Sequence, residues 1–403
     1  MFFIFLVFIL VTNTIEFFLY KTLFNPYSLI SLVYCFLISL NNYYAVSRFS
    51  FFEVEDKTMI FLSFFLLLVF IISILFRFLS IEKTSTRLNL CEYKEMIFKK
   101  EKVILIFFDI GLIAKYISLF QSISRYGFDN LKGNAFGIFA HIGSLAGILL
   151  PFVFLIYLSD KKKFFRLITF LLVLVNILIF GGKYLILITV LYVIIFYALI
   201  NRVSTSKVIR YSLIALIFAI FVFFFNYVVR PILELGYFNS DLTKNNFDFA
   251  IQHFFYYLLS PVIAMNSYFS VILNSQIGIP ILFTVPINIF KALFRVGNYV
   301  SPIYEDTVQI SPGLGTNVAG FFAEAIHTGG WLIGTVTIIF FFVFVYYCYV
   351  KYIRYSRLTA LTSYLLSVVI FMFFGNFLTV SGVVLNIMYL VVLEILLTKK
   401  ITL

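Results

Sequence analysis

Charge is scarce in this sequence. Only 12% of its 403 residues are charged and 63% are hydrophobic, whereas soluble domains carry about 25% charged residues. This balance excludes a cytosolic enzyme, a disordered tail protein and a secreted disulfide scaffold. Cysteine is scarce as well. The three cysteines, Cys35, Cys91 and Cys348, lie too far apart to predict a disulfide framework or a metal-binding knuckle.

Nucleotide-binding and metalloenzyme motifs are missing too. Gly181-Gly182-Lys183 lies between two apolar runs and lacks the rest of a phosphate-binding loop. There is no dinucleotide-binding glycine motif, no H-E-x-x-H and no nucleophile elbow. These absences argue against an ATP-driven pump or a zinc protease. A reaction would have to draw its energy from an activated substrate in the membrane, and transport from a gradient.

Long apolar runs dominate the chain. A membrane-spanning helix needs about 20 mainly apolar residues, and about eleven runs approach that length. They lie at 2–19, 27–45, 58–79, 103–121, 136–158, 165–181, 184–200, 211–229, 331–350, 358–377 and 380–397. We therefore predict an all-α, polytopic integral membrane protein with about 11–12 transmembrane helices, organised as a single transmembrane domain over residues 1–403.

Lysine and arginine gather in alternate loops and predict the orientation. The net charge of +12 comes mostly from loops that strict alternation places on one face, at 77–102, 160–166, 202–210, 351–357 and 399–400. Such an excess marks the cytoplasmic side of a membrane protein. It predicts a cytoplasmic C-terminus and an external N-terminus, and it explains the basic charge without a nucleic-acid partner.

With this orientation, residues 230–330 form a long extracytoplasmic segment, where function is expected. The pieces 254–274 and 277–294 are apolar and interrupted by Pro261, Pro280 and Pro286. We predict that they are re-entrant or interfacial helices. The alternative is a further pair of membrane spans.

Polar groups within the predicted spans are few. Asp109 and Lys115 lie six residues apart in one run, so they do not share a helix face as an i,i+4 pair would. Each is expected to find a partner on another helix or a wet cavity, or else to reach the interface by snorkelling. His141, in an apolar run beside Gly143, is predicted to be a packed or hydrogen-bonded core residue.

Basic side chains in the outer segments are candidates for phosphate binding. Arg125, Arg230, Lys291 and Arg295 lie there. Arginine presents a planar fork of donors that suits phosphate, and lysine a point charge. Anchoring to anionic lipid headgroups is the alternative for each.

Two histidines are candidate bases. His253 precedes Tyr256 and Tyr257 by three and four positions. Glu324 and His327 would be i,i+3 neighbours on one helix face. A carboxylate beside an imidazole fixes its tautomer, as a general base requires. The same pair could merely brace a helix that enters the membrane.

Glu53, Glu55 and Asp56 form an acidic run. Such oxygen ligands can hold Mg²⁺ or Mn²⁺, although such a run is more commonly a solvated linker. No histidine spacing predicts a metal site, and we expect no resident metal.

Two stretches resemble the oligosaccharide repeat-unit polymerases of the Wzy type, which build O-antigen and capsular polysaccharides. Residues 257–264, Tyr-Leu-Leu-Ser-Pro-Val-Ile-Ala, are similar to the family's Tyr-x-x-small-Pro stretch. Gly315-Thr316-Asn317-Val318, followed by Glu324-x-x-His327-x-Gly329, resembles the Thr/Asn-rich start of a helix in that family. The hydropathy plan also agrees. The paired R-x(10)-G motifs of some members are absent, and His327 stands where many relatives have Asp or Asn.

The resemblance implies glycosyl transfer at the outer face of a bacterial inner (plasma) membrane. The growing glycan would leave undecaprenyl diphosphate and join a hydroxyl of the next lipid-linked oligosaccharide. Arg230 and Arg295, with Arg125 and Lys291, would bind the diphosphate, and His327 or His253 would take the proton. Glu324 would orient the imidazole. Tyr256, Tyr257 and Asn317 would contact the sugars.

The resemblance implies no cofactor and no metal, and it allows a chain-length regulator as a protein partner. Three alternatives remain at this point. One is an O-antigen ligase, which would act on lipopolysaccharide. Another is a polyprenyl-phosphate-sugar glycosyltransferase that uses the acidic run and a metal. The third, from another class, is a polysaccharide flippase or transporter.

Overall fold

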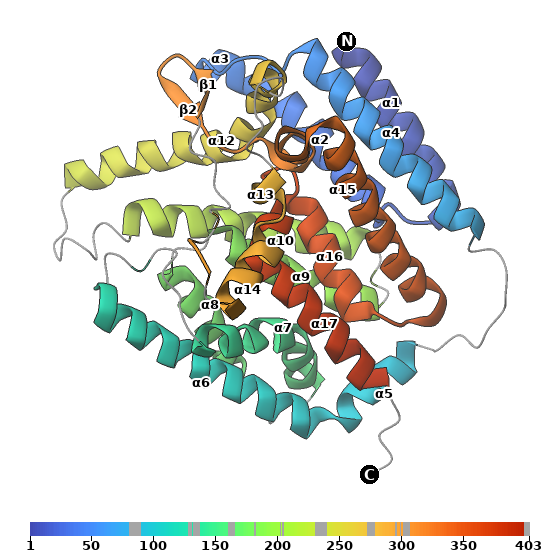
Figure 1. The fold of residues 1–403 in the computed structure, drawn as a ribbon, viewed down its shortest axis with the longest axis vertical. Helices are drawn as coiled ribbons and strands as arrows, with labels where there is room; N and C mark the ends of the chain where they lie inside the picture. Colours follow the sequence, from blue (N-terminus) through green and yellow to red (C-terminus); the bar gives the residue numbers. More distant parts are fainter. Residues whose placement is uncertain are drawn as a thin grey trace. The chain divides into compact units, whose positions relative to one another are not determined.

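The computed structural model describes residues 1–79, 90–127, 131, 138–159, 166–180, 183–201, 203, 205–229, 240–271, 279–294, 296–298, 300 and 307–398 (Figure 1). Two of the predicted site residues, Arg230 and Arg295, lie outside this part of the chain.

Helices make up nearly all of the described structure. The helical elements are α1 (Phe2–Tyr20), α2 (Pro26–Leu40), η1 (Asn41–Ala45), α3 (Val46–Phe49), α4 (Asp56–Leu79), α5 (Leu90–Lys99), α6 (Glu101–Tyr126), α7 (Ile138–Ser159), α8 (Leu167–Ile179), α9 (Lys183–Asn201), α10 (Thr205–Phe224), η3 (Phe225–Val229), α12 (Ser240–Val271), α13 (Ile279–Leu282), α14 (Thr284–Phe294), α15 (Gly320–Tyr355), α16 (Thr359–Phe371), η4 (Phe377–Thr379) and α17 (Ser381–Thr398). Two short strands, β1 (Val308–Ser311) and β2 (Leu314–Thr316), pair antiparallel as a hairpin before α15.

Seven helices among the described residues are long and apolar enough to cross a membrane. They are α1, α2 continued through η1 and α3, α4, α6, α7, α9 from Tyr184 onward, and α15. The shorter apolar helices α8, α16 and α17 coincide with further predicted runs. The prediction of an all-α, polytopic membrane protein is confirmed.

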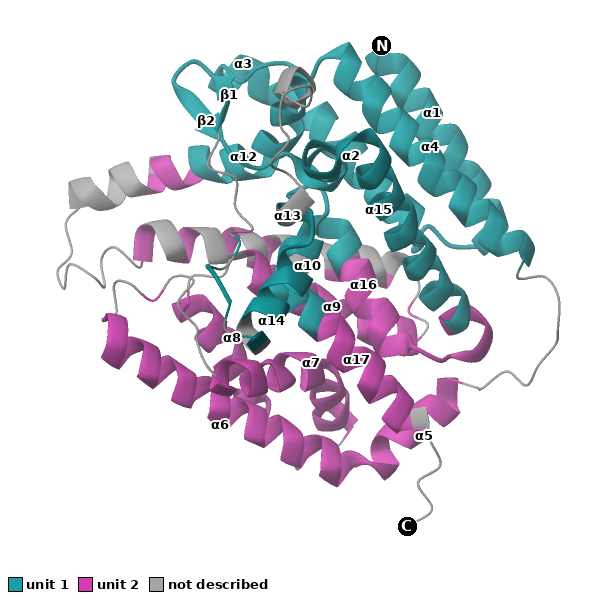
Figure 2. Cartoon of the chain, viewed as in Figure 1, with its two compact units in different colours: residues 1–85, 252–351, 368–385 teal, residues 86–251, 352–367, 386–403 magenta. Residues whose placement is uncertain are grey.

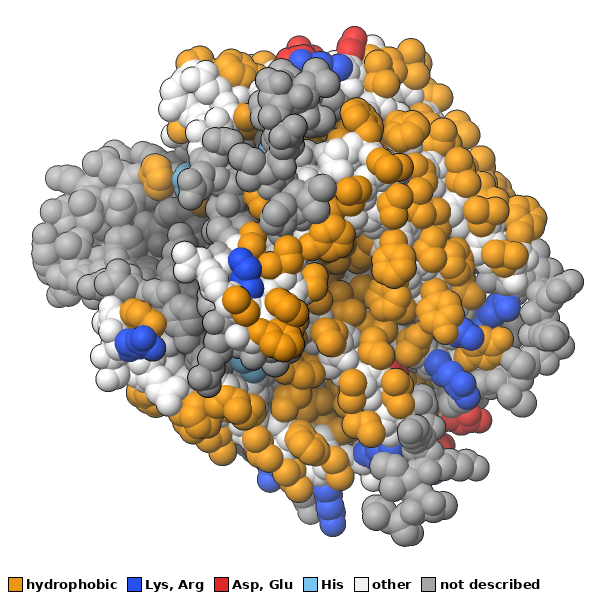
Figure 3. Space-filling view, in the orientation of Figure 1, with side chains coloured by type: hydrophobic (Ala, Val, Ile, Leu, Met, Phe, Trp, Pro, Cys, Tyr) orange, Lys and Arg blue, Asp and Glu red, His pale blue; other side chains and the backbone are white. Residues whose placement is uncertain are grey.

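The outward faces of α1 and α4 are apolar, as a lipid environment requires. Phe3 is 76% exposed, Leu10 69% and Phe78 62%. Figure 3 shows hydrophobic side chains covering this face. A soluble protein rarely leaves so large an apolar surface uncovered. These side chains are therefore expected to face lipid.

The chain forms two compact units (Figure 2). Unit 1 comprises residues 1–85, 252–351 and 368–385, and unit 2 comprises residues 86–251, 352–367 and 386–403. Both units are discontinuous in sequence. Most of the predicted site residues belong to unit 1.

In unit 2, glycines allow α6 and α7 to pack closely. A Cβ at Gly111 would lie 2.6 Å from a backbone nitrogen of α7, and one at Gly143 would lie 2.8 Å from Cγ of Lys115. Lys115 is half-buried at this crossing, whereas Asp109 is exposed on α6. His141 is also exposed. The prediction that His141 packs in the core is wrong, because it lies in the first turn of α7, ahead of the buried stretch.

In unit 1, α15 is not one straight helix. Gly330 has φ 65° and ψ 179°, which breaks the helical geometry. The rings of Phe321 and Phe341 lie 5.6 Å apart between centroids, although 20 residues of unbroken helix would separate them by about 30 Å. A Cβ at Gly334 would lie 2.5 Å from the carbonyl oxygen of Ala325. Residues 320–329, here called the half-helix, therefore fold back against the long helix that begins at residue 331.

The three prolines that were predicted to interrupt the apolar segments of this region do not all do so. Helix α12 continues through Pro261, which was expected to interrupt it. Residues 259–266 around it are buried, and this packing offsets the lost backbone hydrogen bond. Pro280 and Pro286 instead lie in the first turns of α13 and α14, where a helix has no use for the missing N–H.

Candidate functional site

A short irregular segment, residues 372–380, separates α16 from α17 in unit 1. We call it the break. The Asn376 side chain accepts a hydrogen bond from the Leu378 N–H at 3.1 Å. The carbonyl of Met372 accepts one from the Phe321 N–H at 2.8 Å and one from the Tyr34 hydroxyl at 3.4 Å. Irregular backbone in an apolar bundle needs such partners, because lipid offers none.

Glu324 joins the half-helix to the break. One carboxylate oxygen accepts the N–H of Ala319 at 3.1 Å, and the other accepts the N–H of Asn376 at 2.6 Å. A Cβ at Gly375 would lie 3.4 Å from both oxygens, so glycine leaves room for the carboxylate. Both oxygens thus bind backbone N–H groups, and the orientation of His327 by Glu324 stays a prediction.

His327 and Asn317 lie on either side of Glu324 along the chain. His327 is 6% exposed and belongs to the half-helix. Asn317 is half-buried in the link between β2 and α15. Both belong to unit 1. Their chemical roles stay predictions.

Helix α12 carries an aromatic group made of His253, Tyr256 and Tyr257. The imidazole of His253 stacks parallel to the ring of Tyr256, with 5.1 Å between ring centroids. It meets the ring of Tyr257 edge-on, with 4.8 Å between centroids. Tyr257 stacks on Phe374 of the break at 6.2 Å. The Tyr256 hydroxyl donates to the carbonyl of Gly315 in β2. The group therefore lies between the hairpin and the break.

The phenol of Tyr256 is poised as a neutral donor. Partial burial raises its pKa, and the hydroxyl of Thr316 acts in the opposite direction. All three side chains of the aromatic group are half-buried rather than enclosed. Ring faces of this kind can stack on a sugar ring, and an imidazole beside them can accept a hydroxyl proton.

Asn266 anchors α12 to the loop before α4, a contact that the sequence reasoning missed. Its side-chain oxygen accepts the Glu55 N–H at 3.0 Å and the Thr58 hydroxyl at 2.7 Å. Its amide nitrogen donates to the carbonyl of Glu53 at 2.7 Å. A buried asparagine in an apolar stretch is unusual, and that signal could have identified it.

The three carboxylates of the acidic run do not point toward a common position. Glu55 pairs with Lys57 at 2.8 Å, and Asp56 lies 3.7 Å from the terminal amino group of Met1. Glu53 accepts from the side chain of Asn42 at 3.5 Å. Within the described part of the chain, no three acidic, histidine or cysteine side chains gather as metal ligands do. The run serves as a solvated, ion-paired linker.

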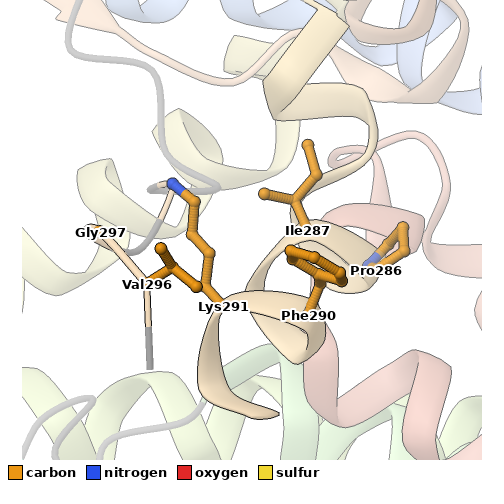
Figure 4. A pocket seen from close by; sticks show the side chains of 6 residues that line it. All are labelled: Pro286, Ile287, Phe290, Lys291, Val296 and Gly297. Carbon is orange, nitrogen blue, oxygen red and sulfur yellow. The ribbon is translucent and has the colours of Figure 1, made fainter. Parts of the chain in front are cut away.

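An apolar pocket of about 510 Å³ lies along α14 (Figure 4). It is lined by Pro286, Ile287, Phe290, Lys291, Val296 and Gly297. The Lys291 ammonium donates to the carbonyl of Asn298 at 2.6 Å, which holds the cation at the rim. Both α13 and α14 contact η4 of the break. An apolar pocket with one cation suits an apolar chain that ends in an anion.

Arg125, unlike the residues above, belongs to unit 2. It lies in the last turn of α6, with its guanidinium 5.4 Å from the ring centroid of Tyr126. The structure thus brings together the α12 aromatic group, Glu324 and α14, which carries Lys291, around the break.

Comparison with known proteins gives one family. Neither the curated proteins nor the solved structures give a match. Residues 50–403 match a family of unknown function, DUF6337. This stretch includes the half-helix, the break, the α12 aromatic group and α14, whereas α1, α2, η1 and α3 precede it. The chain belongs to the DUF6337 family.

Proposed function

We propose that the protein is a glycosyltransferase that polymerises lipid-linked oligosaccharide repeat units into O-antigen or capsular polysaccharide. It would act at the outer face of a bacterial plasma membrane, with its C-terminus in the cytoplasm. The C1 bond from the growing glycan to undecaprenyl diphosphate breaks, and a hydroxyl of the incoming lipid-linked unit forms the new glycosidic bond. That hydroxyl loses its proton to a base, and the lipid diphosphate leaves.

The observation that carries the proposal is what surrounds the break in unit 1. Tyr257 of the α12 aromatic group stacks on Phe374 of the break, and α14, which bears the pocket with its lysine, contacts η4. The ring faces suit a sugar. The apolar pocket suits part of a polyprenyl chain, and the ammonium suits its phosphate.

The residues divide between the two halves of the substrate. Lys291, together with Arg230 and Arg295, would hold the diphosphate and stabilise the charge that develops on it. His253 or His327 would take the hydroxyl proton, and Tyr256 and Tyr257 would contact sugar rings. We assign Glu324 to the backbone of the site rather than to the base, because its oxygens bind two N–H groups.

Substitution of Lys291 tests the pocket. In a strain that lacks the chromosomal gene, Lys291→Ala should lower long-chain polysaccharide at least tenfold, since a charge-assisted contact contributes about 1.5–3 kcal/mol. Polysaccharide length is read on a gel, with protein abundance measured in membranes. Lys57→Ala, an exposed lysine of the same unit, is the matched control and should leave chain length unchanged. Normal chain length with Lys291→Ala would remove the pocket from the mechanism.

Arg230→Ala and the two histidine variants complete the test. Arg230→Ala should abolish long chains while the protein stays inserted. Between His253→Ala and His327→Ala, the true base is the one whose loss abolishes activity with membrane abundance retained. If neither variant slows polymerisation, no imidazole acts as the base.

Two alternative glycan enzymes predict different products. An O-antigen ligase would join glycan to a lipid A core or protein without lengthening it. A metal-dependent glycosyltransferase would lose activity with EDTA. The separate partners of the three acidic side chains count against the second alternative.

A flippase or transporter is the second candidate, because transporters use interrupted helices around their sites. The break and the turn at Gly330 are two such interruptions in unit 1. The two classes separate by where lipid-linked repeat units accumulate in a deletion strain. Loss of a polymerase leaves them on the outer leaflet, and loss of a flippase leaves them on the inner leaflet.

A further inference from the structure

Among the described residues, Glu16 and Glu394 are buried within apolar helices and Glu324 is half-buried, and the last two bind backbone at a helix end. Glu324 accepts the N–H groups of Ala319 and Asn376 in unit 1. In unit 2, Glu394 of α17 accepts the Ala360 N–H at 2.7 Å and the Tyr93 hydroxyl at 3.0 Å. Both therefore satisfy N–H groups at the start of a helix.

Glu16 of α1 is different. Its side chain is fully buried, and neither carboxylate oxygen has a hydrogen-bond partner among the described residues. A buried carboxylate without a partner is costly, and more so in a helix that crosses a membrane. A cation or a proton must compensate the charge. Within the described part of the chain, Glu16 holds no backbone group as Glu324 and Glu394 do, so a bracing role does not explain it.

Hydroxyl groups from four helices of unit 1 surround Glu16. The Ser73 hydroxyl of α4 faces the carboxylate without reaching hydrogen-bond geometry. The phenols of Tyr20 in α1, Tyr27 in α2 and Tyr346 in α15 also interact with its charge.

These hydroxyls are already engaged with one another or with backbone. Tyr27 and Thr12 share a hydrogen bond of 2.5 Å. The Tyr346 hydroxyl accepts the Tyr27 N–H at 3.0 Å, and the Tyr20 hydroxyl donates to the Ser73 carbonyl at 2.9 Å. They are committed elsewhere and do not form a shell of oxygen ligands aimed at a metal ion. A proton on the carboxylate needs no such shell.

A polar route leads from Glu16 to the end of the bundle. Tyr20 and Arg77 each lie four residues, or about 6 Å along a helix, beyond Glu16 and Ser73 respectively. The Ser73 hydroxyl lies 3.4 Å from the Tyr20 hydroxyl. The Arg77 guanidinium lies over the Tyr20 ring, 6.0 Å from its centroid. Ser73, Tyr20 and Arg77 therefore form a continuous line of polar groups that leads toward the ends of α1 and α4.

We propose that Glu16 is a reversible proton-binding site, which exchanges protons through Ser73 and Tyr20 with the face that carries Arg77. The carboxylate takes up one proton to become the neutral acid and releases it by the same route, and no other bond changes. The site uses α1, α2, α4 and α15. It is independent of the proposed glycosyl transfer, because none of its residues belongs to the candidate substrate site.

Carbodiimide labelling of the purified full-length protein tests the proposal. Dicyclohexylcarbodiimide reacts with protonated carboxyl groups in apolar surroundings, and mass spectrometry locates the adduct. We expect an adduct on Glu16 at about pH 6 that falls at least about fivefold by about pH 9, since buried glutamates titrate in this range. Glu16→Gln should remove the adduct. Glu394→Gln, a change at another buried glutamate, should leave the Glu16 adduct and its pH dependence intact.

Labelling of the wild-type protein gives a result even if Glu16→Gln fails to fold. An adduct on Glu16 that declines with pH supports the proposal. No adduct at any pH, or an adduct that does not change with pH, overturns it. Protection of Glu16 by sodium ions at constant pH would identify a metal-cation site, and this also overturns the proposal.

Discussion

Gly320 begins α15 in a conformation that other residues adopt only with strain, with φ at +72°. A Cβ there would lie 2.7 Å from Cε of Met265 and 2.7 Å from the carbonyl oxygen of Phe373. The methionine can move, but the backbone carbonyl belongs to the break that Glu324 holds. The glycine thus allows α12, the half-helix and the break to meet at one point.

We predict that Gly320→Ala lowers the free energy of unfolding by about 2 kcal/mol or more, through backbone strain and the clash with Phe373. Gly382→Ala is the matched control. It lies in the first turn of α17 with no positive φ and nothing within 4 Å of an added Cβ, so it should be neutral or stabilise slightly. Thermal unfolding of both variants in detergent measures the difference. Equal melting temperatures would contradict the close meeting at Gly320.

At the scale of elements, the reversal of α15 at Gly330, here called the α15 turn, has the largest consequence for the site. It turns residues 320–329 back along the following helix, so that Glu324 reaches the break rather than extending the long helix. The stack of Phe321 on Phe341 and the contact of Gly334 with Ala325 fix this arrangement. Small residues at the contact let the two backbones approach, as in other membrane helix pairs.

We predict that cysteines at positions 321 and 341 can be joined by a short bis-maleimide, in a protein whose three native cysteines are replaced by serine. The two positions would be about 30 Å apart in a straight helix, beyond the reagent's reach. Cysteines at 331 and 351 form the control pair, with the same separation in sequence but within the unbroken part. Mass spectrometry of a proteolytic digest detects the cross-linked peptides of either pair. If the cysteines at 321 and 341 are not joined, or if those at 331 and 351 are, the reversal of α15 at Gly330 is refuted.

The hydropathy of the sequence predicts the spanning helices well, because a lipid-facing helix shows its length directly in its apolar residues. Helices α1, α4 and α6 fall within a few residues of the predicted runs. Hydropathy could not predict the reversal of α15 at Gly330. The helical segments on both sides of it are apolar, and Gly329-Gly330 indicates a turn only once the contacts around it are known.

The site was predicted only in part, for a similar reason. Glu324, Lys291 and the α12 aromatic group stand out as polar or aromatic residues in an outer segment. The role of Glu324 and the anchor at Asn266 depend on backbone groups from distant parts of the chain. No local spacing encodes such partners. Pro261 was expected to interrupt a helix, but α12 continues through it, because tertiary packing outweighs the local preference of proline.

At the scale of the whole molecule, the distribution of basic residues decides which face of the membrane carries the site. Lys99 lies in α5, and Lys351 and Arg354 lie near the end of α15, in regions predicted to be cytoplasmic. The hairpin of β1 and β2 precedes α15, and residues 331–350 of that helix match a predicted span. If that span crosses the membrane once, the hairpin and Lys351 lie on opposite faces.

We therefore predict that a cysteine at Leu314, exposed in β2, reacts with a membrane-impermeant maleimide in spheroplasts of cells that produce the cysteine-free variant. A cysteine at Lys99, also exposed, should react only after the membrane is permeabilised. The reverse pattern would place the hairpin and the α12 aromatic group in the cytoplasm, where polymerisation on an outward-facing lipid carrier is impossible. Reaction of both positions in sealed spheroplasts would leave the hairpin of β1 and β2 outside and show that Lys99 is not cytoplasmic, so the orientation of α5 rather than that of α15 would have to be revised. Reaction at Leu314 is the result that the proposed function requires, because it places the hairpin of β1 and β2, and the aromatic group that contacts it, on the side of the outer leaflet.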